Sequence, residues 1–364
     1  MDLTRRELLR SLGLLVAGSG LADRTSASGS SGRSTRSIRK IPLIHTTDLY
    51  HPPQDPDDQI DLATVFALEE YDLKAVILDV TERFLRDAPE GYDIARVPGY
   101  APVAQMARVT GRAVPAAQGP VRPLRYPEDT CPDAPPEGQA GIQMILDVLA
   151  ESPEPVTISV TGSPRTVTAA YHREPLLVTD KTRAVLLNAG STGGEKTEWN
   201  VQLDPQAYVG LWRSVLPIHW FPPGTESGAF DPAHERGTYW KAERAALFRN
   251  LPPPVRAYFA YALGTDIQQG ERNLWSTASL AMGAHRVLAK TDEGWRFQRE
   301  SESEGFEIWP WRLDPIEAAV GADGRVRWKV VDTRSNRCIF GRQPGREFGA
   351  AMTEALNALF RGIA

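Results

Sequence analysis

The chain has 364 residues, of which 41% are hydrophobic, and a formal net charge of −5 at pH 7. This length suffices for one large α/β domain or two small ones, and an acidic chain without a stripe of basic and aromatic residues is not expected to bind nucleic acid. With two cysteines, Cys131 and Cys338, the chain is not a disulfide scaffold, and the sequence leaves open whether the two pair.

Residues 1–40 are predicted to be a targeting segment. Arg5 and Arg6 form a twin-arginine pattern, and the apolar stretch Leu12 to Leu21 follows it. This stretch is too short and too rich in Gly and Ser to span a bilayer stably, which takes about 20 apolar residues. Residues 23–40 resemble a cleavage zone and a disordered lead-in. We therefore expect a protein exported in the folded state by the twin-arginine pathway to the periplasm or the extracellular space.

The most informative segment lies between residues 41 and 68, where an acidic cluster follows a predicted strand. The short apolar run Pro42 to Thr46 ends at Asp48, and more aspartates follow within and after a Pro-rich loop. These are Asp55, Asp57, Asp58 and Asp61. Carboxylates between a strand end and the next helix converge on the crevice where open α/β sheets bind ligands. Like charges packed there need a cation or a polar ligand. The alternative is a solvated loop with a helix cap, but for the set we predict a hard-cation site.

Strands and helices then alternate along the chain. Short apolar, β-branched runs predict strands at 73–80, 113–117, 156–160, 183–187 and 216–221. Apolar residues at helical spacing predict helices at 99–110, 141–150, 165 to about 171, 204–214, 277–289 and 348–360, with a hairpin at Gly324. Seven prolines in residues 115–136 predict a loop. The alternation predicts a single α/β domain over residues 41–364, with a mostly parallel open sheet and helices on both faces.

Three separated segments carry recognisable motifs: Thr46 to Asp48 with Asp57-Asp58, Val160 to Thr166, and Glu198 to Ala207. Together they resemble the nucleoside hydrolase family, the inosine-uridine-preferring enzymes and their relatives. Thr46 to Asp48 and then Asp57-Asp58 fit the family's Asp-x-Asp-Pro-Gly-x-Asp-Asp motif, with five inserted residues, Thr46 for the first Asp, and no Pro-Gly. Val160 to Thr166 fits the family's Thr-Gly-Pro-Leu-Thr-Asn, and Glu198 to Ala207 closely follows Glu-Phe-Asn-x-x-x-Asp-Pro-Glu-Ala. Together the segments cover about residues 41–222, half of the chain.

The resemblance implies a nucleoside-hydrolase-like fold with a calcium (Ca²⁺) site. Asp48 would be a metal ligand and the base that accepts a proton from the attacking water, Asp58 a second ligand, and Thr161 a third through its carbonyl. Calcium prefers carboxylate and carbonyl oxygens, which suits these residue types. For Thr161 the alternative is a simple turn at Thr161-Gly162.

The same resemblance implies a sugar-binding set. Asp57, Glu198 and Asn200 would bind sugar hydroxyls, and carboxylates near the sugar would stabilise the oxocarbenium-like state of glycosidic cleavage. The alternative for Glu198 and Asn200 is that they are ordinary polar loop residues.

The chain departs from the family at a late helix, where the family carries a His-Asp pair. Trp275 and Ser276 take those places here; serine is a weaker, neutral ligand, and tryptophan cannot donate a proton at a useful pKa. Trp275 is therefore assigned to the substrate pocket, while Asp266 or His285 could serve from a shifted register. The loop Tyr50 to Asp55 is also foreign to the family. It either reshapes the sugar pocket and supplies His51 as a replacement acid, or is a plain insertion.

Two functions from different classes follow. The first is an exported, calcium-dependent glycoside hydrolase that cleaves the N-ribosyl or related glycosidic bond of a small-molecule nucleoside or glycoside with metal-activated water. The second is a catalytically degenerate sugar- or nucleoside-binding protein of the same fold. The retained acidic and amide residues favour the enzyme, and the lost His-Asp pair favours the binding protein. The sequence does not decide whether the protein forms a homo-oligomer.

Overall fold

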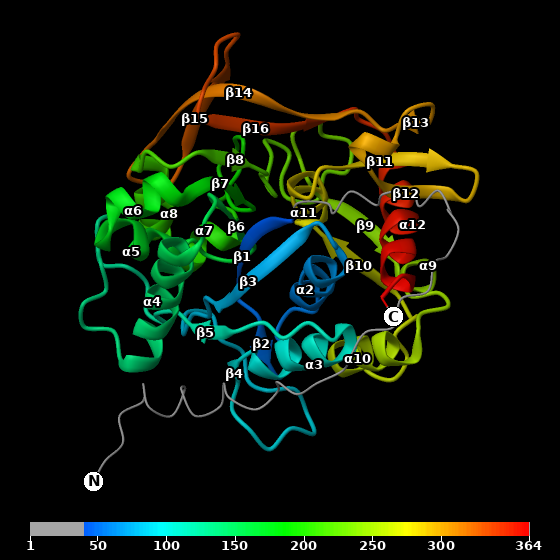
Figure 1. The fold of residues 1–364 in the computed structure, drawn as a ribbon, viewed down its shortest axis with the longest axis horizontal. Coiled ribbons are helices and arrows are strands. Elements are labelled where there is room, and N and C mark those ends of the chain that lie inside the picture. The colour runs from blue at the N-terminus through cyan, green and yellow to red at the C-terminus, as the bar shows by residue number, and fades with distance from the viewer. Residues whose placement is uncertain (1–39, 364) are drawn as a thin grey trace, which may run out of the picture. The chain divides into compact units, whose positions relative to one another are not determined.

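Nine strands form the central sheet of the computed structural model, which describes residues 40–363 (Figure 1). In their order across the sheet, they are β15 (Val326–Val330), β14 (Trp311–Val320), β16 (Arg337–Arg342), β8 (Ile218–Trp220), β7 (Thr182–Leu187), β6 (Val156–Val160), β1 (Ile41–Thr47), β3 (Tyr71–Leu78) and β5 (Ala116–Gln118). Neighbours from β16 to β5 pair in parallel, whereas β14 is antiparallel to both of its neighbours. The predicted mostly parallel sheet is therefore confirmed.

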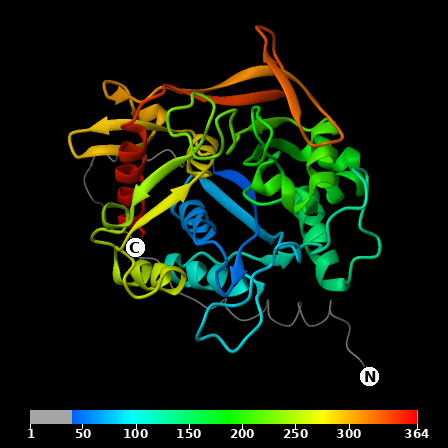
Figure 2. The same ribbon diagram turned by 180° about the vertical axis from the view of Figure 1, so that it is seen from behind.

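Helices cover both faces of this sheet (Figures 1 and 2). They are α2 (Asp57–Ala67), α3 (Tyr100–Thr110), α4 (Pro136–Glu151), α5 (Arg165–Arg173), α6 (Pro175–Lys181), α7 (Trp199–Leu203), α8 (Pro205–Arg213), α9 (Arg244–Leu247), α10 (Pro253–Leu263), α11 (Thr277–Gly283) and α12 (Phe348–Arg361). Successive side chains of a strand point to opposite faces. Leu43 of β1 accordingly belongs to the apolar cluster that includes residues of α2, α3, α10 and α12, and Ile44 to the cluster that includes residues of α4, α5 and α8. The parallel part of the sheet is thus buried on both sides, as continuous apolar strands require, whereas most residues of β14 and β15 are exposed or half-buried.

Three small antiparallel sheets, one in the first half of the chain and two in the second half, were not predicted from the sequence. They contain β2 (Tyr50–His51) with β4 (Val97–Pro98), β9 (Trp240–Glu243) with β10 (Glu271–Leu274), and β11 (Arg286–Thr291) with β12 (Gly294–Arg299) and β13 (Glu307–Ile308). The helix expected at 277–289 is consequently too long. The helix α11 ends at Gly283, His285 takes a left-handed φ of 55°, and β11 begins at Arg286.

A buried arginine joins the segments that follow β3, β5 and β6 to the connection between α7 and α8. Arg165, whose side chain is fully buried, donates from Nε to Asp204 Oδ2 at 2.9 Å and from Nη1 to the carbonyls of Val80 (3.0 Å) and Pro120 (2.6 Å). Its guanidinium also lies 3.7 Å from the carboxylate of Asp79. Burial raises the pKa of Asp79 to about 6, and the charge of Arg165 opposes that rise. This cluster secures the ends of β3, β5 and β6 together.

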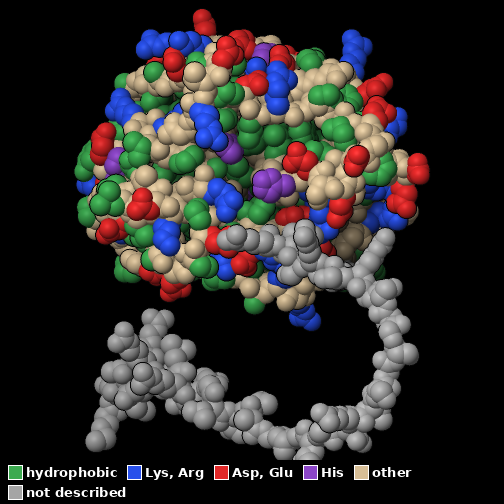
Figure 3. All heavy atoms as spheres, turned by 45° about the horizontal axis from the view of Figure 1, so that its top comes forward, with side chains coloured by type: hydrophobic (Ala, Val, Ile, Leu, Met, Phe, Trp, Pro, Cys, Tyr) green, Lys and Arg blue, Asp and Glu red, His purple; other side chains and the backbone are tan. Residues whose placement is uncertain are grey.

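The two cysteines are not paired: Cys131 is buried and Cys338 is half-buried, and both are free thiols. Within residues 40–363, no helix is both long and apolar enough to cross a membrane. The twin-arginine segment and the lead-in at residues 1–39 lie outside the described residues. On the face shown in Figure 3, acidic and basic side chains are interspersed.

A second buried ion pair gives the fold a pH dependence. Glu70, 5% exposed, accepts from Arg286 at 2.9 Å and from Arg299 at 2.7 Å. Burial alone would raise the pKa of Glu70, but hydrogen bonds and charges from the two arginines outweigh it, so the pKa lies below its usual value. A depressed pKa contributes stability that is complete above the unfolded value, about 4.3, and is lost as the pH falls through the folded value.

We therefore expect Glu70→Gln to lower the free energy of unfolding by about 1.5–3 kcal/mol at pH 7, since charged hydrogen bonds are lost. The difference from the wild type should shrink as the pH is lowered from 6 to 3, as measured by urea denaturation. Glu317→Gln is the matched control, because the Lys329–Glu317 pair is largely exposed and such pairs contribute about 0–1 kcal/mol. A loss for Glu70→Gln that does not change with pH would contradict this assignment.

Candidate active site

A pocket of about 330 Å³ lies at the carboxyl ends of β1, β6 and β7, which are neighbours in the sheet. Seven of the eight residues predicted for the site line it: Asp48, Asp57, Asp58, Thr161, Glu198, Asn200 and Trp275. Ligand sites of open α/β sheets are expected at this edge. The structure thus brings together residues that are more than 200 positions apart in the sequence.

The ends of β1 and β6 place Asp48 against the turn at Thr161-Gly162. The backbone N–H of Thr161 donates to the carbonyl of Thr46 at 3.0 Å, which continues the parallel ladder by one residue. A Cβ on Gly162 would lie 2.9 Å from Oδ1 of Asp48. Any side chain at Gly162 would therefore displace the carboxylate, so glycine is required for this close approach.

The N-terminus of α2 supplies the other carboxylates. Asp57 and Asp58 form its first turn, where the partial positive charge of the helix favours anions. The hydroxyl of Thr47 donates to Oδ1 of Asp58 at 3.5 Å. Asp61 follows three residues after Asp58 and so lies on the same helix face. Asp58 and Asp61 are 7% and 3% exposed, so this face of α2 carries buried acids.

These buried acids repel one another. Burial, with the negative charges of Asp55 and Asp79, raises the pKa of Asp48 to about 7. Burial and neighbouring aspartates also raise the pKa values of Asp57 and Asp58 well above the usual range. Within residues 40–363, none of these three side chains forms an ion pair with a Lys, Arg or His. A bound cation would relieve this repulsion.

The site fits a hard cation only if carboxylate and backbone carbonyl oxygens bind it together. Across the described part of the chain, no three His, Cys, Asp or Glu side chains are grouped so that they could hold a metal ion by themselves. Asp48, Asp58 and the carbonyl of Thr161 are a mixed set of two carboxylates and one backbone oxygen. Calcium accepts such sets when water completes its six to eight ligands. The donor set is unsuited to zinc, which prefers nitrogen and sulfur.

Opposite the acids, Glu198 is held by the backbone. Its Oε2 accepts from the N–H groups of Gly190 (2.8 Å) and Val201 (3.4 Å), and its Oε1 accepts from the N–H of Asn200 (3.0 Å). Burial raises the pKa of Glu198 to about 7, and these backbone hydrogen bonds oppose the rise. Because Oε1 has one backbone partner, it retains acceptor capacity toward a ligand. Glu198 is thus both the N-cap of α7 and a wall of the pocket.

Two amides complete this wall. Asn200 donates from Nδ2 to the carbonyl of Asn188 at 2.9 Å, which leaves its own carbonyl oxygen for other partners. Asn188, 1% exposed, donates to the carbonyls of Val160 (3.0 Å) and Leu186 (3.4 Å), while its buried Oδ1 has no partner within the described residues. The polarity of this wall is set by backbone contacts that fix both amide orientations.

Aromatic side chains form the outer part of the pocket. Trp275 lies 5.9 Å, ring centroid to ring centroid, from both Phe230 and Tyr239, and donates from Nε1 to the carbonyl of Ala229 at 3.4 Å. Trp199 contacts Phe84 at 5.2 Å. Phe230 and Trp199 are 63% and 42% exposed, in contrast to the buried acids. The pocket is therefore polar at its floor and aromatic at its mouth.

The eighth predicted residue, His51, lies elsewhere. Its Nδ1 is hydrogen-bonded to the hydroxyl of Tyr261, and the two rings stack at 5.7 Å. It does not line the pocket, and neither do Asp266 or His285.

The sequence prediction of the site also omitted residues. Arg86 and Gln54 line the pocket, although neither was predicted for the site. Asp61, a member of the predicted acidic cluster to which no individual role was given, reaches the pocket wall through a hydrogen bond with Ser276. Burial raises the pKa of Asp61 to about 7, and that hydrogen bond opposes the rise. The spacing of Asp61 from Asp58 was the available signal, whereas nothing in the sequence marked the loop that carries Arg86.

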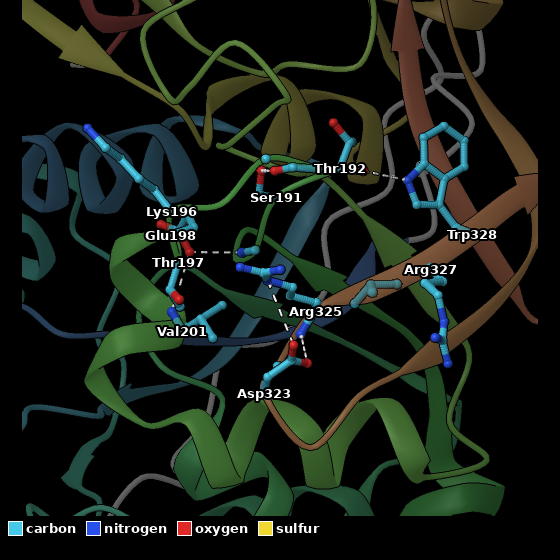
Figure 4. A pocket seen from close by; sticks show the side chains of 15 residues that line it. Ser191, Thr192, Lys196, Thr197, Glu198, Val201, Asp323, Arg325, Arg327 and Trp328 are labelled. Carbon is cyan, nitrogen blue, oxygen red and sulfur yellow. Dashed lines mark hydrogen bonds and ion pairs between the residues drawn. The ribbon is translucent and has the colours of Figure 1, made fainter.

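A second pocket, of about 370 Å³, lies behind Glu198 (Figure 4). It is bounded by the loop Gly190–Glu198 and the turn between β14 and β15. Trp328 donates from Nε1 to the carbonyl of Thr192 at 3.0 Å, and Arg325 pairs with Asp323 at 3.7 Å. Glu198 is the one residue that lines both pockets. The buried aspartates are absent from this second pocket, so we assign the chemistry to the first.

Comparison with known proteins agrees with this fold. No protein-family model matches the chain. It is similar to the pyrimidine-specific ribonucleoside hydrolase RihA of Citrobacter koseri, with 24% identity over 259 residues, which cover 65% of this chain and 74% of that protein. It is similar to RihA of Salmonella choleraesuis at 24% over 272 residues, 68% of this chain and 78% of that protein.

Solved structures show the same architecture. The purine-preferring ribonucleoside hydrolase from Gardnerella vaginalis superposes with a TM-score of 0.55 at 15% identity, covering 88% of this chain and 99% of that one. An inosine-guanosine nucleoside hydrolase superposes with a TM-score of 0.55 at 10% identity, covering 88% of this chain and 98% of that one. This chain therefore has the nucleoside hydrolase fold, and the relatives that it resembles in sequence are ribonucleoside hydrolases.

Proposed function

We propose that the protein is a calcium-dependent hydrolase that cleaves the N-glycosidic bond of a nucleoside or a related riboside. The observation that carries this proposal is the convergence of three motifs, from the ends of β1, β6 and β7, on one pocket with an acidic floor and an aromatic mouth. The relatives named above are ribonucleoside hydrolases, which supports hydrolysis of a glycosidic bond.

In this proposal Asp48, Asp58 and the Thr161 carbonyl hold the cation. When bound, the cation would supply Lewis acidity toward the attacking water. Ser276 stands where the family has a charged ligand, and Asp61 is hydrogen-bonded to it. Asp61, on α2, would thereby supply the negative charge that is missing at Ser276, the N-cap of α11.

The remaining residues act on the substrate. Asp48 accepts a proton from the attacking water, as a carboxylate within hydrogen-bond reach can do. Asp57, Glu198 and Asn200 bind the sugar hydroxyls, and nearby carboxylates stabilise positive charge on the sugar as the bond breaks. Trp199, Phe230 and Trp275 pack against the leaving group at the mouth, where flat apolar surface is available.

Incubation of the purified, calcium-loaded protein with inosine, uridine and 4-nitrophenyl riboside tests this function. We expect release of free base or nitrophenolate, with the aryl riboside cleaved faster because its leaving group departs without protonation. The second candidate is a binding protein of the same fold, favoured by Trp275 and Ser276 at the late helix. Calorimetric binding of ribosides without any hydrolysis would establish that candidate instead.

The cation site predicts a thermal shift. Calcium at 100 times its dissociation constant should stabilise the wild type by about 2.7 kcal/mol, which corresponds to a rise in Tm of about 4 °C for a domain of this size. Asp58→Ala should abolish that rise, because a buried carboxylate ligand is removed. Asp180→Ala, an exposed change on α6, is the control and should respond as the wild type does. Elemental analysis that finds no metal, with a calcium-insensitive wild-type Tm, would refute the site.

We further propose export through the twin-arginine pathway. Replacing Arg5 and Arg6 with Lys-Lys should retain the full-length protein in the cytoplasm, because the receptor of that pathway reads the arginine pair as an address. Cell fractionation followed by immunoblotting measures this. Unchanged export of the Lys-Lys variant would show that another signal is used.

A further inference from the structure

One cationic side chain faces the acidic pocket. Among the described residues that line it, Arg86 is the sole Lys, Arg or His, against five acidic residues. It belongs to the segment 79–96, which connects β3 to β4 without a helix or strand. The side chain of Arg86 is exposed and makes no ion pair of its own within residues 40–363. It is therefore available to a ligand.

The backbone around Arg86 is fixed to the inserted loop. The N–H of Arg86 donates to Oε1 of Gln54 at 3.3 Å, and its carbonyl accepts from Nε of Arg96 at 2.7 Å. Arg96 also donates from Nη1 to the carbonyls of Pro52 (3.0 Å) and Pro53 (2.6 Å). Arg96 thus binds two loops at once, and the insertion after Asp48 is part of what holds Arg86 at the pocket.

The exposed fractions of the residues that line the pocket indicate which part of a substrate would contact Arg86. The floor residues Asp58, Thr161 and Asn188 are 7%, 6% and 1% exposed. The mouth residues Trp199 and Phe230 are 42% and 63% exposed, and Arg86 is exposed with them. A riboside whose sugar reaches the acidic floor must place its leaving group at the mouth. Arg86 then lies beside the atoms that depart.

We propose that Arg86 stabilises the negative charge that develops on the departing group. This inference rests on the proposed function. In the step, the water oxygen forms a bond to the anomeric carbon and gives its proton to Asp48, while the glycosidic bond breaks and its electron pair goes to the leaving group. The resulting anion later takes a proton from solvent. A guanidinium is always charged and donates hydrogen bonds, so it opposes that charge without transferring a proton.

The test compares Arg86→Met and Arg86→Lys with the wild type on ribosides whose leaving groups differ in pKa, from inosine and uridine to 4-nitrophenyl riboside. Loss of one preorganised donor at a developing anion costs about 10²–10³-fold in rate. We expect such a loss in kcat/KM for inosine and uridine with Arg86→Met, a much smaller loss for the aryl riboside, and partial recovery with Arg86→Lys. A plot of log kcat/KM against leaving-group pKa should therefore be steeper for Arg86→Met.

Arg83→Met is the matched control. Arg83 belongs to the same segment and lies over the Phe84 ring at 4.9 Å, but it does not line the pocket, so its slope should equal that of the wild type. Equal losses for every riboside with Arg86→Met would mean that Arg86 only aids binding, and would overturn the inference while leaving the proposed function intact. A wild type that hydrolyses no riboside would overturn both.

Discussion

Replacing Asp48 with asparagine should lower kcat for riboside hydrolysis by about 10²–10⁴-fold, the usual contribution of a positioned general base. The amide preserves the shape that packs against Gly162, where a Cβ would lie 2.9 Å from the Asp48 oxygen, but it cannot accept the proton of water. Substrate binding depends on Glu198, Asn200 and Asp57, so the dissociation constant of a riboside should change by no more than about tenfold. An effect on kcat far larger than on binding identifies an interaction made in the transition state.

Single-turnover kinetics and calorimetry measure the two quantities separately. Asp180→Asn controls for the loss of one negative charge at an exposed site and should leave both unchanged. Equal losses in kcat and in affinity would show that Asp48 serves only to build the pocket.

Arg165→Met should cause the largest loss of stability, about 3–5 kcal/mol in the free energy of unfolding. Removing one partner of a buried ion pair leaves the other charge uncompensated in a poorly solvated site, and here two carboxylates, Asp79 and Asp204, would lose their cation. The carbonyls of Val80 and Pro120 would also lose a donor. Urea denaturation at pH 7 measures the change as a lower transition midpoint.

The triple variant Asp79→Asn, Arg165→Met, Asp204→Asn provides the informative comparison. If the loss of stability in Arg165→Met comes from carboxylates left without a cation, replacing Asp79 and Asp204 with neutral amides should recover part of that stability. Arg325→Met, on an exposed ion pair, should cost no more than about 1 kcal/mol. A triple variant less stable than Arg165→Met alone would show that hydrogen bonding to the loops, and not charge compensation, accounts for the loss.

The first half of the chain was predictable because its elements are regular. β6 was predicted at its observed bounds, and β1, β3, β7, α3 and α8 were predicted within a few residues. In the second half, α12 and the hairpin at Gly324 were also predicted. The strands β9 to β13 were not, because short antiparallel strands are stabilised by partners distant in sequence. The apolar residues of 286–291 fit a helix as well as a strand. The left-handed backbone at His285 ends the helix, and pairing with β12 stabilises residues 286–291 as a strand.

The site was predictable where a motif follows a strand and unpredictable where a loop folds back. Asp48 and Thr161 each follow directly after a predicted strand, and parallel pairing brings these two strand ends together. His51 belongs to the two-residue strand β2 and Arg86 to an irregular segment, and the direction of both depends on contacts such as those of Arg96 and Tyr261. Sequence spacing contains no information about these contacts. Of the alternatives left open for the inserted loop, the structure favours a part in shaping the pocket, because Gln54 accepts from the N–H of Arg86.

The pairing of β1 with β6, in which Leu43 lies opposite Thr157, has a kinetic consequence. The acids of β1 and α2 acquire the Thr161 carbonyl only after more than 100 intervening residues have been organised, so a partly folded chain has no complete binding site. A ligand that recognises only the finished site cannot accelerate folding, because nothing in the transition state yet binds it. It can only slow unfolding. A site assembled from distant strands should therefore make the ligand-bound protein unfold more slowly, while its rate of refolding stays unchanged.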